Sequence, residues 1–376
     1  MSVDVLIAGG GLAGSLAAWR IAALHPSASL LLLESGTTLG GNHTWSFHDT
    51  DIAPGQRAWL QPLITAHWPK HDVRFPSYAR VLDGGYATVT AERLHAVIAP
   101  TLGTRVRLAT PVQTLDRDGV TLHDGSRIDA RLVIDARGGG PEHVPVGWQS
   151  FLGQEVRLHA PHGLQWPTLM DATVDQRGGY RFIYVLPFTA DTLLIEDTYY
   201  IDGPAIDADA CRHAIADYAR DHRWSIAEVV REETGALPIP LGGTLDDFRA
   251  LSPALAIGVR AGLFQPTTGY SLPEAVATAS LLSEGHLNDP PRVYARMHSY
   301  AAARWRAGAF NRLLNRWLFR AAVPGERRVI FEQFYRRAEP TIARFYAGRL
   351  TWPDRLRLLT GRPPVSVVRA LAHLRS

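Results

Sequence analysis

The sequence predicts an α/β fold followed by a helical C-terminal region, and three observations support this. Residues 3–34 have the pattern strand, glycine turn, helix, strand, which begins a doubly wound parallel sheet. Residues 151–200 contain several apolar or alternating runs at short intervals, which is typical of antiparallel strands. From Val293 onward the pattern is mostly helical. We therefore expect a doubly wound domain interleaved with a mostly antiparallel sheet, and then helices.

Composition limits the class of protein. The chain has 376 residues, of which 46% are hydrophobic and 20% charged, so one large or two interleaved globular domains are expected. Cys211 is the single cysteine, which excludes an internal disulfide and fits a reducing compartment. The N-terminal segment is apolar, but Asp4 stands where a signal peptide needs positive charge and Arg20 interrupts the run. We therefore expect neither a signal peptide nor a membrane span.

The N-terminal segment carries a glycine fingerprint. Gly9, Gly11 and Gly14 have G-x-G-x-x-G spacing between a strand and a helix. Gly9 allows the tight turn, Gly11 allows a pyrophosphate to approach the backbone, and Gly14 allows close packing of helix and strand. The pyrophosphate would bind the free N–H groups at the helix start. Glu34 ends the second strand and is placed to accept a ribose hydroxyl, which favours FAD or NAD over NADP.

The elements that follow are predicted from periodicity and turn signals. We expect a helix at 58–68, short strands at 73–81 and 85–89, a helix at 91–102, and strands at 105–109, 113–122 and 130–136. The last of these ends in Asp135, followed by Arg137 and three glycines, which returns the chain to the nucleotide edge.

The second half of the chain is also expected to contain a strand that is followed by glycines and a helix. A helix is expected at 209–220 and a strand at 254–259. Ser271 and Glu274 have the spacing of a capping box, with Pro273 in the first turn of the next helix. Pro324, Pro340 and Pro353 are expected to break the C-terminal helices.

Several stretches together resemble one family. The fingerprint, the strand ending at Asp135 and the glycines before the capped helix are similar to FAD-binding flavoproteins of the Rossmann type. Six longer stretches resemble a narrower group, the bacterial lycopene β-cyclases of carotenoid biosynthesis. These stretches are GGNHTWSFH at 40–48, GYRFIYVLP at 179–187, LLIEDTYY at 193–200, REETGALPI at 231–239, RAGLFQPTTGYSLPEAV at 260–276 and FYAGRLTWPDRLRLLTGRPP at 345–364. The resemblance runs from end to end and is weakest in the last few residues.

The resemblance implies an activity and its cofactors. The family closes a β-ionone ring at each end of lycopene, giving β-carotene through γ-carotene. It uses reduced FAD, with NAD(P)H as reductant and no net redox change. The chain has one dinucleotide fingerprint and no second one, so a nicotinamide would bind only transiently. The candidate cofactor-binding residues are Gly9, Gly11, Leu12, Ala13, Gly14, Glu34, Asp135, Arg137, Gly262, Pro266, Thr267, Gly269 and Tyr270.

The resemblance also sets the expected domains. Residues 1–60, 91–150 and 236–290 would form a discontinuous FAD-binding domain. Residues 61–90 and 151–235 would form a β-rich substrate-binding domain, and residues 291–376 a helical region rich in arginine and aromatic residues close to a membrane.

Two acidic pairs are the catalytic candidates. Cyclisation needs an acid in a dry pocket to protonate a terminal double bond, a negative or π-rich group near the cation, and a base. Glu196 and Asp197 end a mostly apolar strand, and successive side chains of a strand face opposite ways, so one of the two should face the substrate. A carboxyl that faces an apolar tunnel has a raised pKa. In the family the first acid of this motif is catalytic, which corresponds to Glu196. Glu232 and Glu233 form either a partner for Glu196 or a surface turn or ion pair.

Other polar and aromatic residues are weaker candidates. Asp171 is a further acid, and Arg137 and Arg260 lie beside the flavin-type motifs, where they either help to hold the pyrophosphate or are solvated. His43 and His48 are near the cofactor loop, and His67 and His71 lack further ligands, so no metal site is expected. The strand aromatics could line a carotenoid tunnel or form plain core: Tyr180, Phe182, Tyr184, Tyr199 and Tyr200.

The C-terminal region is strongly basic. Residues 301–376 contain sixteen Arg and four acidic residues, so their net charge is +12 while the rest of the chain is about −9. Helices with arginine and large aromatics lie in membrane interfaces, and lycopene must come from a bilayer. We therefore expect peripheral attachment to the cytoplasmic side of the inner membrane, the alternative being aromatics that pack on the protein body. No motif for reading nucleic acid accompanies the charge.

Two other functions remain open from the sequence. One is an FAD-dependent hydroxylase or isoprenoid reductase of the same fold, and the other is a non-catalytic carrier of carotenoid or flavin. A change in the mass of the product would indicate the first, and binding without turnover the second. The sequence does not indicate an oligomeric state.

Overall fold

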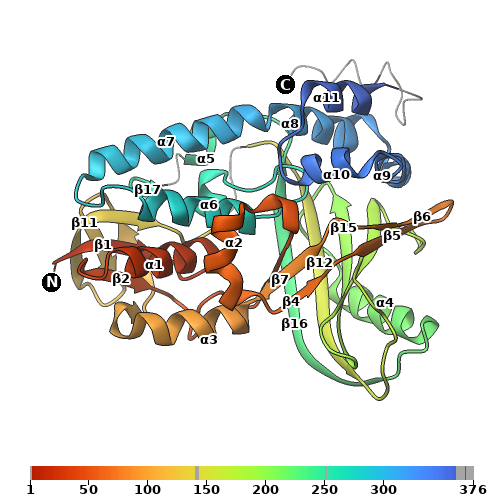
Figure 1. Cartoon of the computed structure of the whole chain (residues 1–376), viewed down its shortest axis with the longest axis horizontal. Coiled ribbons are helices and arrows are strands. Elements are labelled where there is room, and N and C mark those ends of the chain that lie inside the picture. The colour runs from red at the N-terminus through yellow and green to blue at the C-terminus, as the bar shows by residue number, and fades with distance from the viewer. Residues whose placement is uncertain (1, 140–143, 250–251, 361–368, 370–376) are drawn as a thin grey trace.

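A computed structural model describes residues 2–139, 144–249, 252–360 and 369. Figure 1 shows a sheet with helices on the left, long strands on the lower right, and the C-terminal helices on the upper right. The predicted α/β fold with a helical C-terminal region is confirmed. The remaining C-terminal residues, 361–368 and 370–376, were assigned to the helical region and lie outside the described residues.

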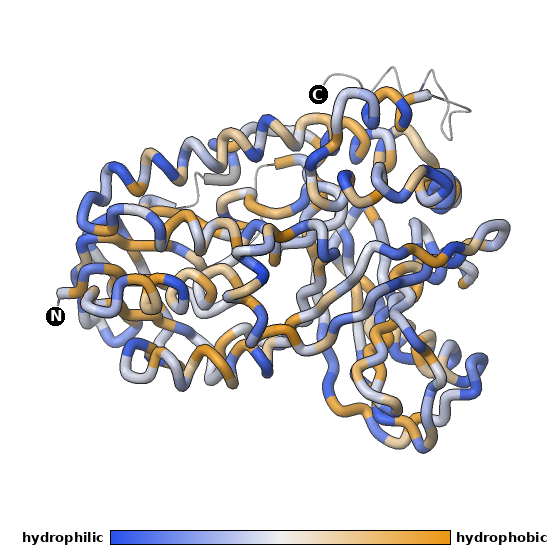
Figure 2. The backbone as a smooth tube through the Cα atoms, viewed as in Figure 1, coloured by the Kyte–Doolittle hydropathy of each residue, from blue (hydrophilic) through white to orange (hydrophobic). Residues whose placement is uncertain are grey.

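The first sheet is the Rossmann-type unit. Its order is β8 (Val106–Arg107), β2 (Leu30–Leu33), β1 (Ser2–Ala8), β11 (Arg127–Asp135), β10 (Gly119–Leu122) and β9 (Val112–Leu115), with β17 (Leu255–Ala256) pairing with β11. The strands β8, β2, β1, β11 and β17 are parallel, whereas β9 and β10 are antiparallel. Apolar strand residues pack in one core with the helices α1 (Leu12–Leu24), α3 (Ala91–Leu102), α6 (Leu272–Ser283) and α7 (Pro290–Ala307). Figure 2 shows how hydrophobic these strands are.

Close contacts account for two of the fingerprint glycines. Gly9 has φ +103°, and a Cβ there would lie 2.5 Å from the carbonyl oxygen of Ala136. A Cβ on Gly14 would lie 1.9 Å from the carbonyl oxygen of Gly9. The predicted tight turn and close packing of helix and strand are therefore confirmed.

The second sheet is large and curved. Its order is β16 (Ile226–Pro240), β12 (Val146–Leu158), β15 (Thr192–Ile201), β14 (Tyr180–Pro187), β13 (Thr168–Asp171), β5 (His71–Phe75) and β6 (Tyr78–Leu82). All neighbours are antiparallel except β13 and β5, as predicted for a mostly antiparallel sheet. The helix α4 (Ala208–Asp221) covers one face, which we call the back face, through Ile215 and Tyr218. The other face, called the front face, meets the rest of the molecule.

A small third sheet joins the two. It contains β3 (Thr44–His48), β7 (Tyr86–Thr90) and β4 (Ala66–Trp68). The predicted helix at 58–68 is wrong in its second half, because α2 (Pro54–Leu60) ends before Pro62 and the chain continues as a 3-10 turn and then β4. The predicted strand at 73–81 is two strands, since Pro76 cannot donate to a ladder.

Two further predictions, for the strand at 254–259 and the start of the helix that follows, are wrong. The strand expected at 254–259 stops at Ala256, because Gly258 adopts φ +66° and begins a 3-10 turn, Gly258–Ala261. The capping box at α6 is not formed, since the Ser271 side chain makes no capping hydrogen bond. Glu274 instead accepts from the Tyr300 hydroxyl at 2.7 Å and pairs with Arg304 of α7.

The described part of the C-terminal region is helical, and Pro324, Pro340 and Pro353 stand at the starts of helices or turns. It contains α8 (Ala309–Arg316), a π-helical turn (Trp317–Ala321), a 3-10 turn (Pro324–Glu326), α9 (Arg327–Tyr335), α10 (Glu339–Tyr346) and α11 (Trp352–Leu359). Arg327 is 1% exposed and fastens the region to the end of β15. It donates to the carbonyl of Tyr200 at 3.0 Å and to Asp202 at 3.0 Å. Shorter elements elsewhere are α5 (Leu245–Arg249) and the 3-10 turns Asp49–Asp51 and Gly103–Arg105.

Candidate active site

A cavity of about 590 Å³ joins the glycine fingerprint to the front face of the second sheet. At one end it is lined by Gly9, Gly11 and Glu34, and at the other by Glu196 and Tyr346. Segments far apart in the chain therefore line one cavity.

The fingerprint end has the features of a dinucleotide site. A Cβ on Gly11 would meet no atom within 4 Å, so the backbone here is open to a bound group. Leu12 and Ala13 begin α1 at this point and line the cavity. Glu34 accepts from the backbone N–H groups of Gly10 at 2.6 Å and Gly36 at 2.7 Å, which fixes its carboxylate at the cavity wall.

An ion cluster stands beside the fingerprint. Asp135 is fully buried and accepts from Arg137 Nε at 2.9 Å, and its other oxygen lies 3.6 Å from Arg260 Nε. Burial opposes ionisation, yet the two guanidinium groups hold the pKa of Asp135 below its usual value. Arg137 lines the cavity, whereas Asp135 serves as its anchor.

The glycine-containing segment before α6 lines the cavity with a different set of residues from those expected. Gly269 and Tyr270 are part of the wall, but Gly262, Pro266 and Thr267 are not among the lining residues. Sequence reasoning missed six lining residues here: Ile257, Gly258, Val259, Thr268, Ser271 and Ala275. The available signal was Gly258 itself, a glycine inside an apparent strand, which often marks a close approach of the backbone.

Glu196 and Asp197 face opposite sides of β15. Glu196 is 8% exposed and lines the cavity. Asp197 lies on the back face, where Arg181 donates to its two oxygens at 2.7 and 3.2 Å. The Tyr199 hydroxyl donates to Asp197 at 2.9 Å. Of the two acids, Glu196 is the one that meets the cavity.

The environment of Glu196 favours its protonated form. Burial and the neighbouring Glu233 raise the pKa of Glu196 to about 8, against a hydrogen bond from the Thr198 hydroxyl at 2.5 Å that lowers it. On the front face Glu196 stands directly between Tyr184 on β14 and Gly153 on β12, and Gly153 pairs in turn with Glu233 on β16. Because Gly153 has no side chain, the two carboxyls face one another across roughly 10 Å, twice the strand spacing.

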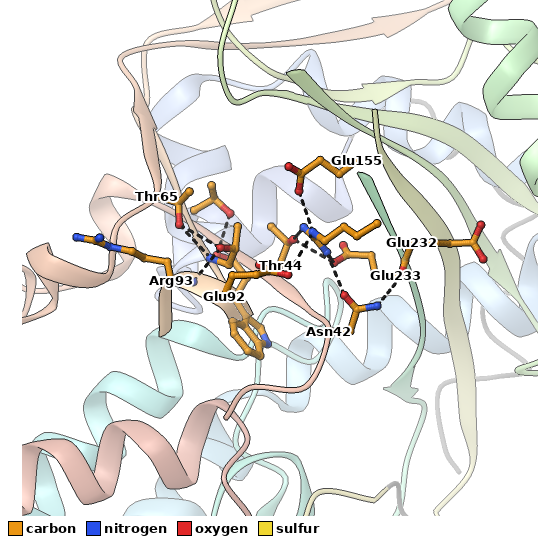
Figure 3. A network of polar contacts seen from close by, with 12 residues as sticks. Asn42, Thr44, Thr65, Glu92, Arg93, Glu155, Glu232 and Glu233 are labelled. Atoms are coloured by element: carbon orange, nitrogen blue, oxygen red, sulfur yellow. Dashed lines mark hydrogen bonds and ion pairs between the residues drawn. The ribbon is translucent and has the colours of Figure 1, made fainter. Parts of the chain in front are cut away.

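Glu232 and Glu233 also point to opposite sides of their strand, as Figure 3 shows. Glu233 is 2% exposed and accepts from Arg231 at 2.6 Å and from the Thr44 hydroxyl at 3.0 Å. Arg231 also donates to Glu155 at 2.8 Å. Glu232 instead accepts from Arg212 of α4 on the back face. Glu233 is therefore a buried neighbour of Glu196, and Glu232 is an ion-pair residue away from the cavity.

Aromatic residues line the cavity around the acid. Of the strand aromatics proposed from sequence, Phe182, Tyr184 and Tyr200 line the cavity, while Tyr180 and Tyr199 are not among the lining residues. Tyr86 of β7 and Tyr346 of α10 also line it and were missed, because nothing in their local sequence indicates that these segments meet β14. Burial raises the pKa of Tyr86, Tyr184 and Tyr270 well above the usual value, so all three remain neutral hydroxyl groups.

Most C-terminal aromatics pack against the second sheet rather than facing solvent. Phe319, Tyr335, Phe345 and Tyr346 are buried in one core with front-face residues. On α11, however, Trp352 is 80% exposed, and Leu356 and Leu359 on the same helix are also exposed. Within residues 2–139, 144–249, 252–360 and 369, no helix combines the length and hydrophobicity needed to cross a bilayer. In the same part of the chain no cluster of three His, Cys, Asp or Glu side chains could hold a metal ion.

Comparison with known proteins gives consistent matches over the whole chain. The family model described as "Lycopene cyclase protein" matches residues 4–372. The chain is 45% identical to lycopene beta-cyclase of Pantoea ananas, over 98% of this chain and 97% of that protein. It is 46% identical to lycopene beta-cyclase of Pseudescherichia vulneris, over 96% and 94% respectively. A structure of a Klebsiella pneumoniae HpxO variant complexed with FAD superposes with a TM-score of 0.64, at 15% identity over 93% of this chain and 98% of that one. At that identity the likeness shows the fold alone.

Proposed function

This chain belongs to the lycopene cyclase family, and we propose that it is a lycopene β-cyclase, an intramolecular lyase that converts the ψ ends of lycopene to β-ionone rings through γ-carotene to β-carotene. The observation that carries the proposal is Glu196, a buried carboxyl with a pKa of about 8 in a cavity continuous with the dinucleotide fingerprint. At neutral pH such a group holds the proton that cyclisation needs.

The chain's own residues supply the acid and the surroundings of the cation. The Glu196 carboxyl donates its proton to the terminal double bond, and the tertiary cation is attacked by the neighbouring double bond. Loss of an adjacent proton then completes the ring. The faces of Tyr184, Tyr200 and Phe182 stabilise the positive charge. Arg181 keeps Asp197 paired on the back face, so that carboxylate does not compete for the substrate.

The residues at the fingerprint fit FAD. The open backbone at Gly11 and the N-terminus of α1 would hold the pyrophosphate, and Glu34 would accept from the ribose. Gly258 and Gly269 contribute backbone to the wall against which a flat ring would lie. When bound in its reduced form, the flavin would supply negative charge near the cation. NAD(P)H would act as a transient reductant, since the chain has a single fingerprint.

The substrate would be drawn from a membrane. The exposed Trp352, Leu356 and Leu359 of α11 support peripheral attachment through the C-terminal region, with neighbouring arginines toward anionic lipid. Its place would be the cytoplasmic side of the inner membrane.

An anaerobic turnover experiment tests the function. Protein with chemically reduced FAD and no nicotinamide is given lycopene in liposomes, and the mass and absorption of the product are followed. A product of unchanged mass with ring-type absorption is expected. Glu196→Gln should bind FAD and form no ring, whereas Glu228→Gln, which removes a surface partner of Arg157, should retain activity. A product changed by two hydrogens, or activity only with oxygen, would move the chain to the reductase or hydroxylase alternative.

A further inference from the structure

Behind the tyrosine wall lies a buried histidine that the proposed reaction does not use. His48 is 3% exposed, and neither of its ring nitrogens has a hydrogen-bond partner among the described residues. Its Nδ1 lies 3.5 Å from Oδ2 of Asp51, a carboxylate that also accepts from the backbone N–H of His48 at 2.8 Å. A buried polar group without a partner demands an explanation, because its desolvation is costly.

The groups that face His48 place it one layer from the cavity. Its ring lies 5.0 Å from that of Tyr86, 4.4 Å from Tyr346 and 6.3 Å from Tyr270, measured between centroids. All three tyrosines line the cavity. The remaining neighbours are Asp51 and His71, whose pKa is lowered to about 3 by burial and by His48, so that His71 is neutral.

A chain of three hydroxyl groups runs from the tyrosines beside this histidine to the strand next to the one that carries Glu196. The hydroxyls of Tyr270 and Tyr86 lie 2.6 Å apart, and those of Tyr86 and Tyr184 lie 2.9 Å apart. Tyr184 stands directly opposite Glu196 on the neighbouring strand and on the same face. Each hydroxyl both donates and accepts, so a proton can pass along the chain by successive exchange.

The proposed function creates a need for such a chain. For each ring, one proton enters the substrate and one leaves it. The O–H bond of Glu196 breaks as the new C–H bond forms, which leaves a carboxylate in a site where burial and Glu233 disfavour charge. Glu196 must recover a proton before the next ring can close.

Resting on the proposed cyclase activity, we propose that the hydroxyls of Tyr184, Tyr86 and Tyr270 relay protons between Glu196 and His48, and that this relay restores the protonated acid after each ring. The C–H bond that breaks in the substrate releases its proton to a hydroxyl of the chain, which passes its own proton on. His48 holds the proton until it returns to the Glu196 carboxylate, so no oxidant or reductant is consumed. Asp51 is a positioning residue that orients the imidazole. The relay requires one bridging water between Tyr184 and Glu196 and another between Tyr270 and His48.

A single-turnover experiment with Tyr86→Phe tests the relay, since this variant removes the central hydroxyl and keeps the ring. Protein with oxidised FAD is loaded anaerobically with lycopene, and the reaction is started by photoreduction of the flavin. Every ring, including the first, should form about a hundredfold more slowly than in the wild type, with a larger solvent deuterium isotope effect, because the proton lost by the substrate leaves through the same hydroxyls. His48→Gln, which leaves the tyrosines intact, should show the same slow rate and the same isotope effect.

A purely structural role would not change the solvent isotope effect. Tyr218→Phe is the matched control, because Tyr218 is a buried tyrosine whose hydroxyl donates to Asp171 at 2.9 Å and lies outside the cavity lining. It should show the wild-type rate and the wild-type isotope effect. The relay is overturned if Tyr86→Phe and His48→Gln slow ring formation without a change in the isotope effect, or if they do not slow it. If the wild-type protein itself forms no ring under these conditions, the proposed function fails instead.

Discussion

Replacing Glu196 by Gln should make the stability of the protein less dependent on pH. Glu196 has a pKa of about 8 in the folded protein against an ordinary value of 4.5. Between these two values the folded protein keeps a proton that the unfolded chain has released. The wild-type free energy of unfolding therefore contains a contribution that is fully present below about pH 4.5 and is lost as the pH rises toward 8. A glutamine does not titrate, so the variant lacks this dependence.

The size of the effect follows from the two pKa values. One pKa unit corresponds to about 1.4 kcal/mol, so the stability of Glu196→Gln relative to wild type should rise by about that amount per pH unit. Across the whole window the rise is about 5 kcal/mol. This is a large part of the stability of an ordinary domain, and it should be readily measured.

Urea unfolding of both proteins at pH 5, 6, 7 and 8, at one FAD concentration, measures the difference. The matched control is Glu232→Gln on β16, where Arg212 holds the pKa of Glu232 below its ordinary value. The stability that this pair contributes is present above the ordinary pKa and is lost only in more acidic solution. The difference in unfolding free energy between Glu232→Gln and the wild type should therefore not change from pH 6 to 8. A flat difference for Glu196→Gln over the same range would show that Glu196 is ionised in the folded protein, and would remove the reason for calling it the acid.

Three further changes test other parts of the structure. Gly14→Ala should prevent folding, because its Cβ would lie 1.9 Å from a carbonyl oxygen, whereas Gly11→Ala should fold but lose FAD, as flavin absorbance after desalting will show. Asp197→Asn should lower the free energy of unfolding by about 3–5 kcal/mol in urea titrations, since it leaves Arg181 buried without a counter-charge. Trp352→Ser should reduce co-sedimentation with anionic liposomes severalfold without changing flavin content, because the ring is 80% exposed on α11.

Each of these has a control within the same chain. Gly55→Ala introduces a Cβ that meets no atom within 4 Å and should fold normally. Asp209→Asn, in an exposed ion pair, should leave stability nearly unchanged. Val229→Ser removes an exposed apolar side chain of β16 and should not alter liposome binding. The role of Gly11 would be contradicted if Gly11→Ala bound FAD with wild-type affinity. The role of the Arg181–Asp197 pair would be contradicted if Asp197→Asn had unchanged stability. The role of Trp352 would be contradicted if the Trp352 and Val229 variants lost liposome binding equally.

Local sequence was sufficient where local geometry decides the outcome. The contacts around Gly9 and Gly14 follow from a fixed spacing between a strand and a helix, so this unit was predicted correctly. The alternation of β15 likewise required Glu196 and Asp197 to face opposite ways. Which of them would face the cavity depends on where α4 returns to cover the sheet, and that is a long-range fact.

Features made by distant segments could not be predicted. Tyr86 and Tyr346 reach the cavity from elements 260 positions apart, and no periodicity links them. The capping box failed for a similar reason, because Tyr300 and Arg304 of α7 take the carboxylate of Glu274. The domain boundaries and the roles of the proposed site residues stay predictions.

Arg327 connects the C-terminal helices to the second sheet, although the two are far apart in the sequence. Its guanidinium bonds the carbonyl of Tyr200 and the side chain of Asp202, at the end of the strand that carries Glu196. Removing the helices from α9 onward would leave those acceptors without the cation that satisfies them. The C-terminal helices are therefore part of the folded body of the protein, and a version that lacks them should lose the shape of the strand that carries Glu196.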